Sequence, residues 1–242
     1  MVDANYVADI RKYHRSESSA PAPFSQPGVK VPCPDISIGF RASLLGERLK
    51  LLGLTNQATE LLFRSLANPD SRNGNRPLVC SEPTQAILGI RFPFLVVEGK
   101  SYATNKNIYE AQNQAAVSGA CSIQNLHDLD DLARKAIVQS CNAPHDQQGK
   151  ELELELEQKQ PIHFSICTQG PIHELWAHYA TMESGSRKYN MFLVKACNMG
   201  ISDDVCGFLE AVDNVMTWAV DEHLAKIVSK LMEVAAAALS HG

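Results

Sequence analysis

The chain has 242 residues, 45% of them hydrophobic and 20% charged, which suffices for the core of one large soluble domain. Its net charge of −5 argues against a basic coat for non-specific nucleic-acid binding, but leaves room for a local basic groove. No apolar run approaches the roughly 18 residues that span a bilayer, Met1–Arg15 lacks a signal peptide's apolar core, and the seven cysteines show no zinc-ligand spacing. We therefore expect an intracellular protein of the nucleus or cytoplasm, not secreted, with reduced thiols and no membrane partner.

Composition also indicates the ends of the domain. Residues 1–32 are rich in serine and proline, which predicts a flexible N-terminal arm. We expect residues 33–242 to form a single domain with a polar insertion at about 142–160. Within this insertion, Glu151–Glu157 alternates glutamate with leucine, a pattern that fits either an edge strand or a solvated charged segment.

Hydrophobic spacing predicts a mixture of strands and helices. In chain order, the predicted elements are a strand at 36–40, two helices within 42–67, a strand at 91–100, helices at 108–123 and 126–138, strands at 162–167, 175–180 and 191–196, and a helix at about 203–239 that is broken at most once. Gly53 separates the first two helices, and Thr55 is expected to cap the second. The fold class is therefore α/β (α+β), with a mixed central sheet flanked by helices and a long C-terminal helix.

The strand at 91–100 carries the most informative motif, because an almost wholly apolar run ends in Glu98-Gly99-Lys100. Side chains alternate along a strand, so Glu98 and Lys100 share one face. Charged groups are costly to bury unless they are paired or bind something. A glutamate is a hard ligand for Mg²⁺, the carbonyl of Gly99 can add a second oxygen, and the lysine can orient an attacking water. The same tripeptide is also common as an ordinary ion pair at the end of a strand.

Four segments together resemble the PD-(D/E)XK nuclease superfamily, and within it the fungal proteins described as PD-(D/E)XK nuclease-like. These segments are Pro34–Gly39, Arg91–Lys100, Ile108–Ala116 and Gln169–Trp176. The resemblance implies a restriction-endonuclease-like core with Mg²⁺ or Mn²⁺ as cofactor. It assigns Glu98 as a metal-binding acid and Lys100 as the catalytic lysine.

Two residues compete for the second metal-binding acid. Asp35 belongs to a literal Pro-Asp pair before a strand, but two predicted helices separate it from Glu98. Glu82 lies closer to Glu98 in sequence, at the more usual separation, although Pro83 follows it. Both alternatives stay open at this point. On the helix after the lysine, Gln114 (with Glu110 and Gln112) is a candidate to present polar groups to the metal or the nucleic acid.

The sequence therefore supports two functional hypotheses. The first is a divalent-metal-dependent nuclease that hydrolyses phosphodiester bonds of DNA or RNA. The alternative is an inactive nuclease-like scaffold that binds nucleic acid or a protein partner, favoured by the acidic net charge. The sequence contains no glycine-rich phosphate loop, so an enzyme with a nucleotide cofactor is disfavoured. The apolar segment Ala235–Ala238 of the C-terminal helix offers a surface for a homodimer.

Overall fold

The computed structural model describes residues 33–67, 69–70, 76–77, 79, 89–101, 107–140 and 160–240. The predicted arm at 1–32, Glu82, and the polar insertion apart from Gln160 lie outside these ranges. No helix in the described part of the chain is both long and apolar enough to cross a membrane.

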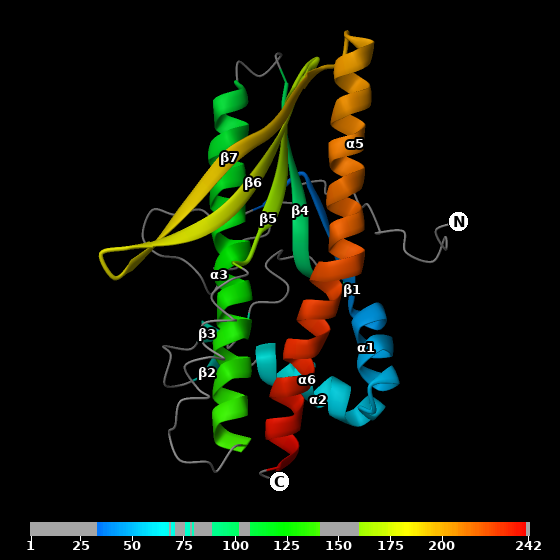
Figure 1. Cartoon of the computed structure of the whole chain (residues 1–242), viewed down its shortest axis with the longest axis vertical. Coiled ribbons are helices and arrows are strands. Elements are labelled where there is room, and N and C mark those ends of the chain that lie inside the picture. The colour runs from blue at the N-terminus through cyan, green and yellow to red at the C-terminus, as the bar shows by residue number, and fades with distance from the viewer. Residues whose placement is uncertain are drawn as a thin grey trace, which may run out of the picture.

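A five-stranded mixed sheet forms the centre of the molecule, as predicted (Figure 1). The strands are β1 (Ile36–Arg41), β4 (Ile90–Lys100), β5 (His163–Gln169), β6 (Ile172–Glu183) and β7 (Ser186–Asn198), in the order β1-β4-β5-β6-β7. The β4–β5 pair is parallel and the other pairs are antiparallel. Two short strands, β2 (Pro69–Asp70) and β3 (Arg76–Pro77), form a separate ribbon that periodicity did not predict.

Helices cover both faces of the sheet and continue below it (Figure 1). They are α1 (Ala42–Leu51), α2 (Asn56–Ala67), α3 (Ile108–Ser140), α5 (Ser202–Trp218) and α6 (Leu224–Ser240), with a π-helical turn, η4 (Ala219–His223), between the last two. The predicted separation of α1 from α2 is confirmed: Gly53 has a φ of +103°, and the amide of Ala58 donates to Oγ1 of Thr55 at 3.1 Å.

Helix α3 corrects one prediction, because residues 108–123 and 126–138 belong to a single helix of 33 residues. The link between the two predicted helices contains Gln124 and Asn125, and neither residue breaks a helix as glycine or proline would. The small side chains of Ala111 and Ala115 are fully buried against Cys167 of β5. The small-residue face predicted for this helix therefore packs closely on the sheet.

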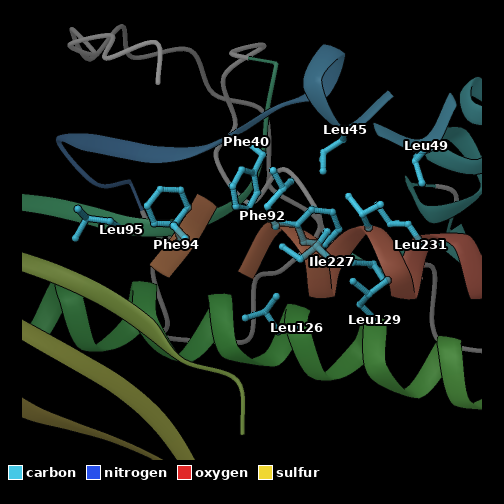
Figure 2. Close-up of a cluster of buried hydrophobic side chains, with 14 of the residues drawn as sticks. Phe40, Leu45, Leu49, Phe92, Phe94, Leu95, Leu126, Leu129, Ile227 and Leu231 are labelled. Carbon is cyan, nitrogen blue, oxygen red and sulfur yellow. The ribbon is translucent and has the colours of Figure 1, made fainter. Parts of the chain in front are cut away.

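The core lies where the lower part of the sheet meets α1, α3 and α6. Figure 2 shows buried side chains from β1, α1, β4, α3 and α6 converging there. The labelled members are Phe40, Leu45, Leu49, Phe92, Phe94, Leu95, Leu126, Leu129, Ile227 and Leu231. The polar end of β4 lies at the other end of the sheet, beside the beginning of α3.

Candidate active site

The pairing of β1 with β4 brings Asp35 to the Glu98-Gly99-Lys100 segment. Ile36 lies opposite Val97 in this antiparallel pair, which places the preceding Asp35 at the end of β4. The amide of Gly99 donates to Oδ2 of Asp35 at 2.7 Å. Asp35 is exposed, whereas only 2% of Glu98 is accessible to solvent. One exposed and one buried carboxylate therefore lie on neighbouring strands.

Glu98 occupies an environment that disfavours its charged form. Burial, and next the negative charge of Asp35, raise the pKa of Glu98 from 4.5 to about 7. The charge of Lys100 and the hydroxyl of Ser118 on α3 lower the same pKa, but they do not cancel the rise. Ser118 itself is buried, and among the described residues its hydroxyl has no partner that meets full hydrogen-bond geometry. The ammonium of Lys100 therefore offsets only part of the negative charge of the Asp35 and Glu98 carboxylates.

The side chain of Lys100 is hydrogen-bonded to helix α3, which follows β4 in the chain. Its ammonium donates to Oε1 of Gln114, an exposed residue one turn after Glu110 on α3. The structure thus brings together four of the predicted site residues: Asp35, Glu98, Lys100 and Gln114. Glu82, the rival of Asp35, lies outside the described residues, so the structure does not compare the two.

Sequence reasoning missed a second polar group on the same face of the sheet. Oε2 of Glu174 on β6 accepts from Nε2 of Gln112 at 2.7 Å and from Nε1 of Trp176 at 2.9 Å. Gln112 therefore ties α3 to β6, while Gln114 ties the same helix to β4. The signal was present in the tight β5–β6 connection: Gln169 pairs with Ile172 across Gly170-Pro171, and this register places Glu174 opposite Cys167.

Cys167 lies between the two glutamates, opposite Glu98 on one side and Glu174 on the other. Burial, followed by the charges of Glu174 and Glu98, raises the pKa of the Cys167 thiol to about 12. A thiol that stays protonated and fully buried is a poor nucleophile. Cysteine-based chemistry is therefore disfavoured at this site.

Histidines form a second buried polar group, farther along the sheet. Nδ1 of His163 lies 3.1 Å from the carbonyl of Pro93, and Nε2 of His178 lies 2.8 Å from Oγ of Ser165. The two imidazole rings are 5.7 Å apart. Both His163 and Ser165 are fully buried, so a substrate cannot reach this Ser–His pair as it would an active site. We interpret these contacts as part of the packing of the sheet.

The donor set at the end of β4 fits a hard divalent cation. Asp35 and Glu98 offer carboxylate oxygens, and Gly99 offers a carbonyl oxygen, which are the ligand types that Mg²⁺ and Mn²⁺ prefer. A cation there would also relieve the repulsion that raises the pKa of Glu98. Within the described ranges, no group of three or more His, Cys, Asp or Glu side chains is arranged to hold a metal ion. The protein side chains would thus supply only part of a coordination shell.

The family described as "Domain of unknown function (DUF7924)" matches the chain over residues 5–231. The chain belongs to this family. Comparison with curated proteins and with solved structures found no match. The family description names no activity.

Proposed function

We propose that this protein is a divalent-metal-dependent nuclease that hydrolyses phosphodiester bonds. The observation that carries the proposal is the pairing of Asp35 with the Glu98-Gly99-Lys100 segment, through the hydrogen bond from Gly99 to Asp35. It places two acids and a lysine at one end of the sheet, beside a polar helix face. The class of substrate also draws on the resemblance to the PD-(D/E)XK nucleases.

Each residue would have a distinct task. Asp35, Glu98 and the carbonyl of Gly99 would hold Mg²⁺ or Mn²⁺. When bound, the cation would supply Lewis-acid stabilisation of the phosphate and a more acidic water. Lys100 would place its ammonium next to the phosphate oxygens, where negative charge accumulates in the transition state. Gln114 would limit the positions of that ammonium through the contact it already makes.

A nuclease assay with matched variants tests this proposal. Supercoiled plasmid and end-labelled single-stranded and duplex oligonucleotides are incubated with increasing Mg²⁺ or Mn²⁺. Glu98→Gln, Asp35→Asn and Lys100→Met should each lower the cleavage rate by about 100- to 1,000-fold. Asp213→Asn, an exposed acid on α5, is the matched control and should cleave at the wild-type rate. Cleavage that persists in Glu98→Gln would rule out the mechanism.

One observation favours the alternative, a scaffold that binds without cutting. The pKa of Glu98, raised by burial and by Asp35 to about 7, leaves this carboxyl partly protonated at neutral pH in the metal-free protein. In a protein that never binds a metal at this site, the Glu98 carboxyl would always be partly protonated at neutral pH. Thermal unfolding with and without Mn²⁺ separates the two functions. Metal stabilisation that is lost in Glu98→Gln supports the nuclease, whereas unchanged unfolding temperatures and no cleavage of any substrate support the scaffold.

A further inference from the structure

Strand β7 exposes an unusual amount of apolar surface. It is the last strand of the sheet, and among the described strands it pairs only with β6. Phe192 near its centre is 53% exposed, and the neighbouring Leu193 and Val194 are exposed as well. A long edge strand with exposed apolar side chains is a ready site for association, which proteins usually block. The exposed edge strand β7 is therefore a candidate binding surface for a partner molecule.

One face of β7 combines an aromatic ring with two cations. Side chains two positions apart in a strand share a face, so one face of β7 carries Lys188, Asn190 and Phe192. Val194 is the extra residue of a β-bulge, so Lys195 returns to that side opposite the buried Leu175. The ring of Phe192 is fixed by an edge-to-face contact with Tyr179 of β6, at 6.3 Å between centroids. We call Lys188, Phe192, Lys195 and Tyr179 the β7 platform.

The charge of β7 contrasts with the rest of the chain. The strand carries Arg187, Lys188 and Lys195 and no acidic residue, in a chain with a net charge of −5. Lys188 forms an exposed ion pair with Glu183 at the hairpin, and Arg187 donates to the neutral Gln124. Exposed ion pairs of this kind contribute little and exchange readily for another anion. The strand is therefore complementary to a polyanion.

We propose that the β7 platform binds a single strand of nucleic acid, with bases stacked on Phe192 and phosphates at Lys188 and Lys195. The class of ligand rests on the proposed nuclease function. The two lysines are roughly 20 Å apart along the strand, a span that accommodates several nucleotides. Unpaired bases can stack on an aromatic ring, whereas the bases of a duplex are already stacked on each other. A second copy of the chain is disfavoured because it would bring the cations of two β7 strands together.

The β7 platform and the candidate active site lie on opposite faces of the sheet, because Phe192 pairs with Ala177 whereas Glu98 shares the other face with Cys167 and Glu174. Lys100, Gln169, Ile172 and Asn198 are successive partners in one row across four neighbouring strands, from the end of β4 to the end of β7. Three strand spacings correspond to about 14 Å. A strand of nucleic acid bound to the β7 platform would reach Glu98 by turning around this end of the sheet onto the opposite face. The proposed substrate is consequently single-stranded, or a duplex with an unpaired end.

Binding is measured on the full chain in EDTA, so that cleavage plays no part. Fluorescence anisotropy reports the Kd for labelled dT20, rU20 and a duplex. Phe192→Leu keeps the apolar surface but removes the ring, and should weaken binding of dT20 or rU20 at least tenfold. The double variant Lys188→Gln/Lys195→Gln should reduce the slope of log Kd against log salt by about 1.4. Leu61→Ser on α2 and Arg64→Gln/Lys226→Gln are matched exposed controls and should bind as wild type.

Three results would overturn the inference: platform variants that bind within twofold of wild type, a duplex bound as tightly as dT20 without dependence on Phe192, or a dimer that Phe192→Leu dissociates. The outcomes are separate from those of the nuclease assay. If Glu98→Gln abolishes cleavage and the platform variants bind normally, the result supports the proposed nuclease function and contradicts binding of nucleic acid at the β7 platform. Single-strand binding that depends on Phe192, in a protein that cuts no substrate, supports the platform and contradicts the nuclease.

Discussion

Two groups of buried titratable side chains differ in how burial changes their pKa values: Glu98 at the end of β4, and three histidines on β5, β6 and η4. At the end of β4, burial and Asp35 raise the pKa of Glu98 to about 7, so ionisation there is resisted but occurs near neutral pH. In the histidine cluster, which consists of His163, His178 and His223, burial lowers the pKa of His178 to about 4 and that of His223 to about 3. These histidines stay neutral at neutral pH. Burial of polar groups is therefore common to both regions, and unbalanced charge next to an exposed carboxylate distinguishes the candidate site.

The largest expected effect comes from neutralising Glu98. The folded-state pKa of Glu98 lies above its unfolded value of 4.5, so its ionisation destabilises the fold as the pH rises from about 4.5 to 7. Glu98→Gln should then raise the free energy of unfolding by about 3 kcal/mol at pH 7.5 in EDTA. Urea denaturation measures this difference, and it should shrink by about 2 kcal/mol at pH 5.0. A destabilised Glu98→Gln protein would show that the carboxylate is satisfied within the fold.

The histidine cluster should respond to pH in the opposite direction. The unfolded chain protonates below about pH 6.5, while His223 in the fold stays neutral to about pH 3, so stability is lost as the pH falls. His223→Phe retains a ring beside Trp218, which stacks at 4.7 Å, and removes this titration. Relative to wild type, its free energy of unfolding should rise by about 2 kcal/mol between pH 7.5 and pH 5.0. His173→Gln, at the surface of β6, is the control. Parallel pH curves for His223→Phe and wild type would contradict the assignment.

A smaller effect is expected where α3 closes over the histidines. A Cβ added at Gly119 would lie 2.3 Å from Nδ1 of His178, so Gly119→Ala forces the helix or the ring to move. We expect a loss of about 1–3 kcal/mol, measured by thermal unfolding. Gly46→Ala on α1 is the matched control, because its Cβ would meet Thr59 at an ordinary 3.7 Å. That variant should be neutral or gain up to about 1 kcal/mol from helix propensity. Equal behaviour of the two variants would mean that α3 is not tightly seated.

Local patterns predicted most of the elements because strand alternation, Gly53 and Thr55 act within a few residues. The division of α3 was wrong because Gln124 and Asn125 interrupt the apolar pattern, whereas the backbone of the helix continues. Gln124 in fact bonds across to Arg187 of β7, a partner that helical spacing along α3 does not reveal.

The geometry of the site was only partly predicted, because some of its contacts are local in sequence and others join distant segments. Alternation alone places Glu98 and Lys100 on one face of β4. The approach of Asp35 depends on the antiparallel register of β1 with β4, across two helices and a ribbon, and the bond between Gln112 and Glu174 depends on how α3 lies on the sheet. Sequence spacing carries no direct signal for either contact.

The position of α6 has a consequence for how the protein is made. Ile227 and Leu231 are almost completely buried in the same cluster as Leu45, Leu49 and Leu129, which come from much earlier in the chain. During synthesis, α1 and the lower half of α3 emerge from the ribosome well before the residues that cover them. The apolar cluster then stays open until α6 has been translated, and contacts between such distant segments form slowly. Apolar surface of this cluster therefore stays exposed during most of synthesis, when it can aggregate, and folding of the described domain is completed only after α6 has been translated.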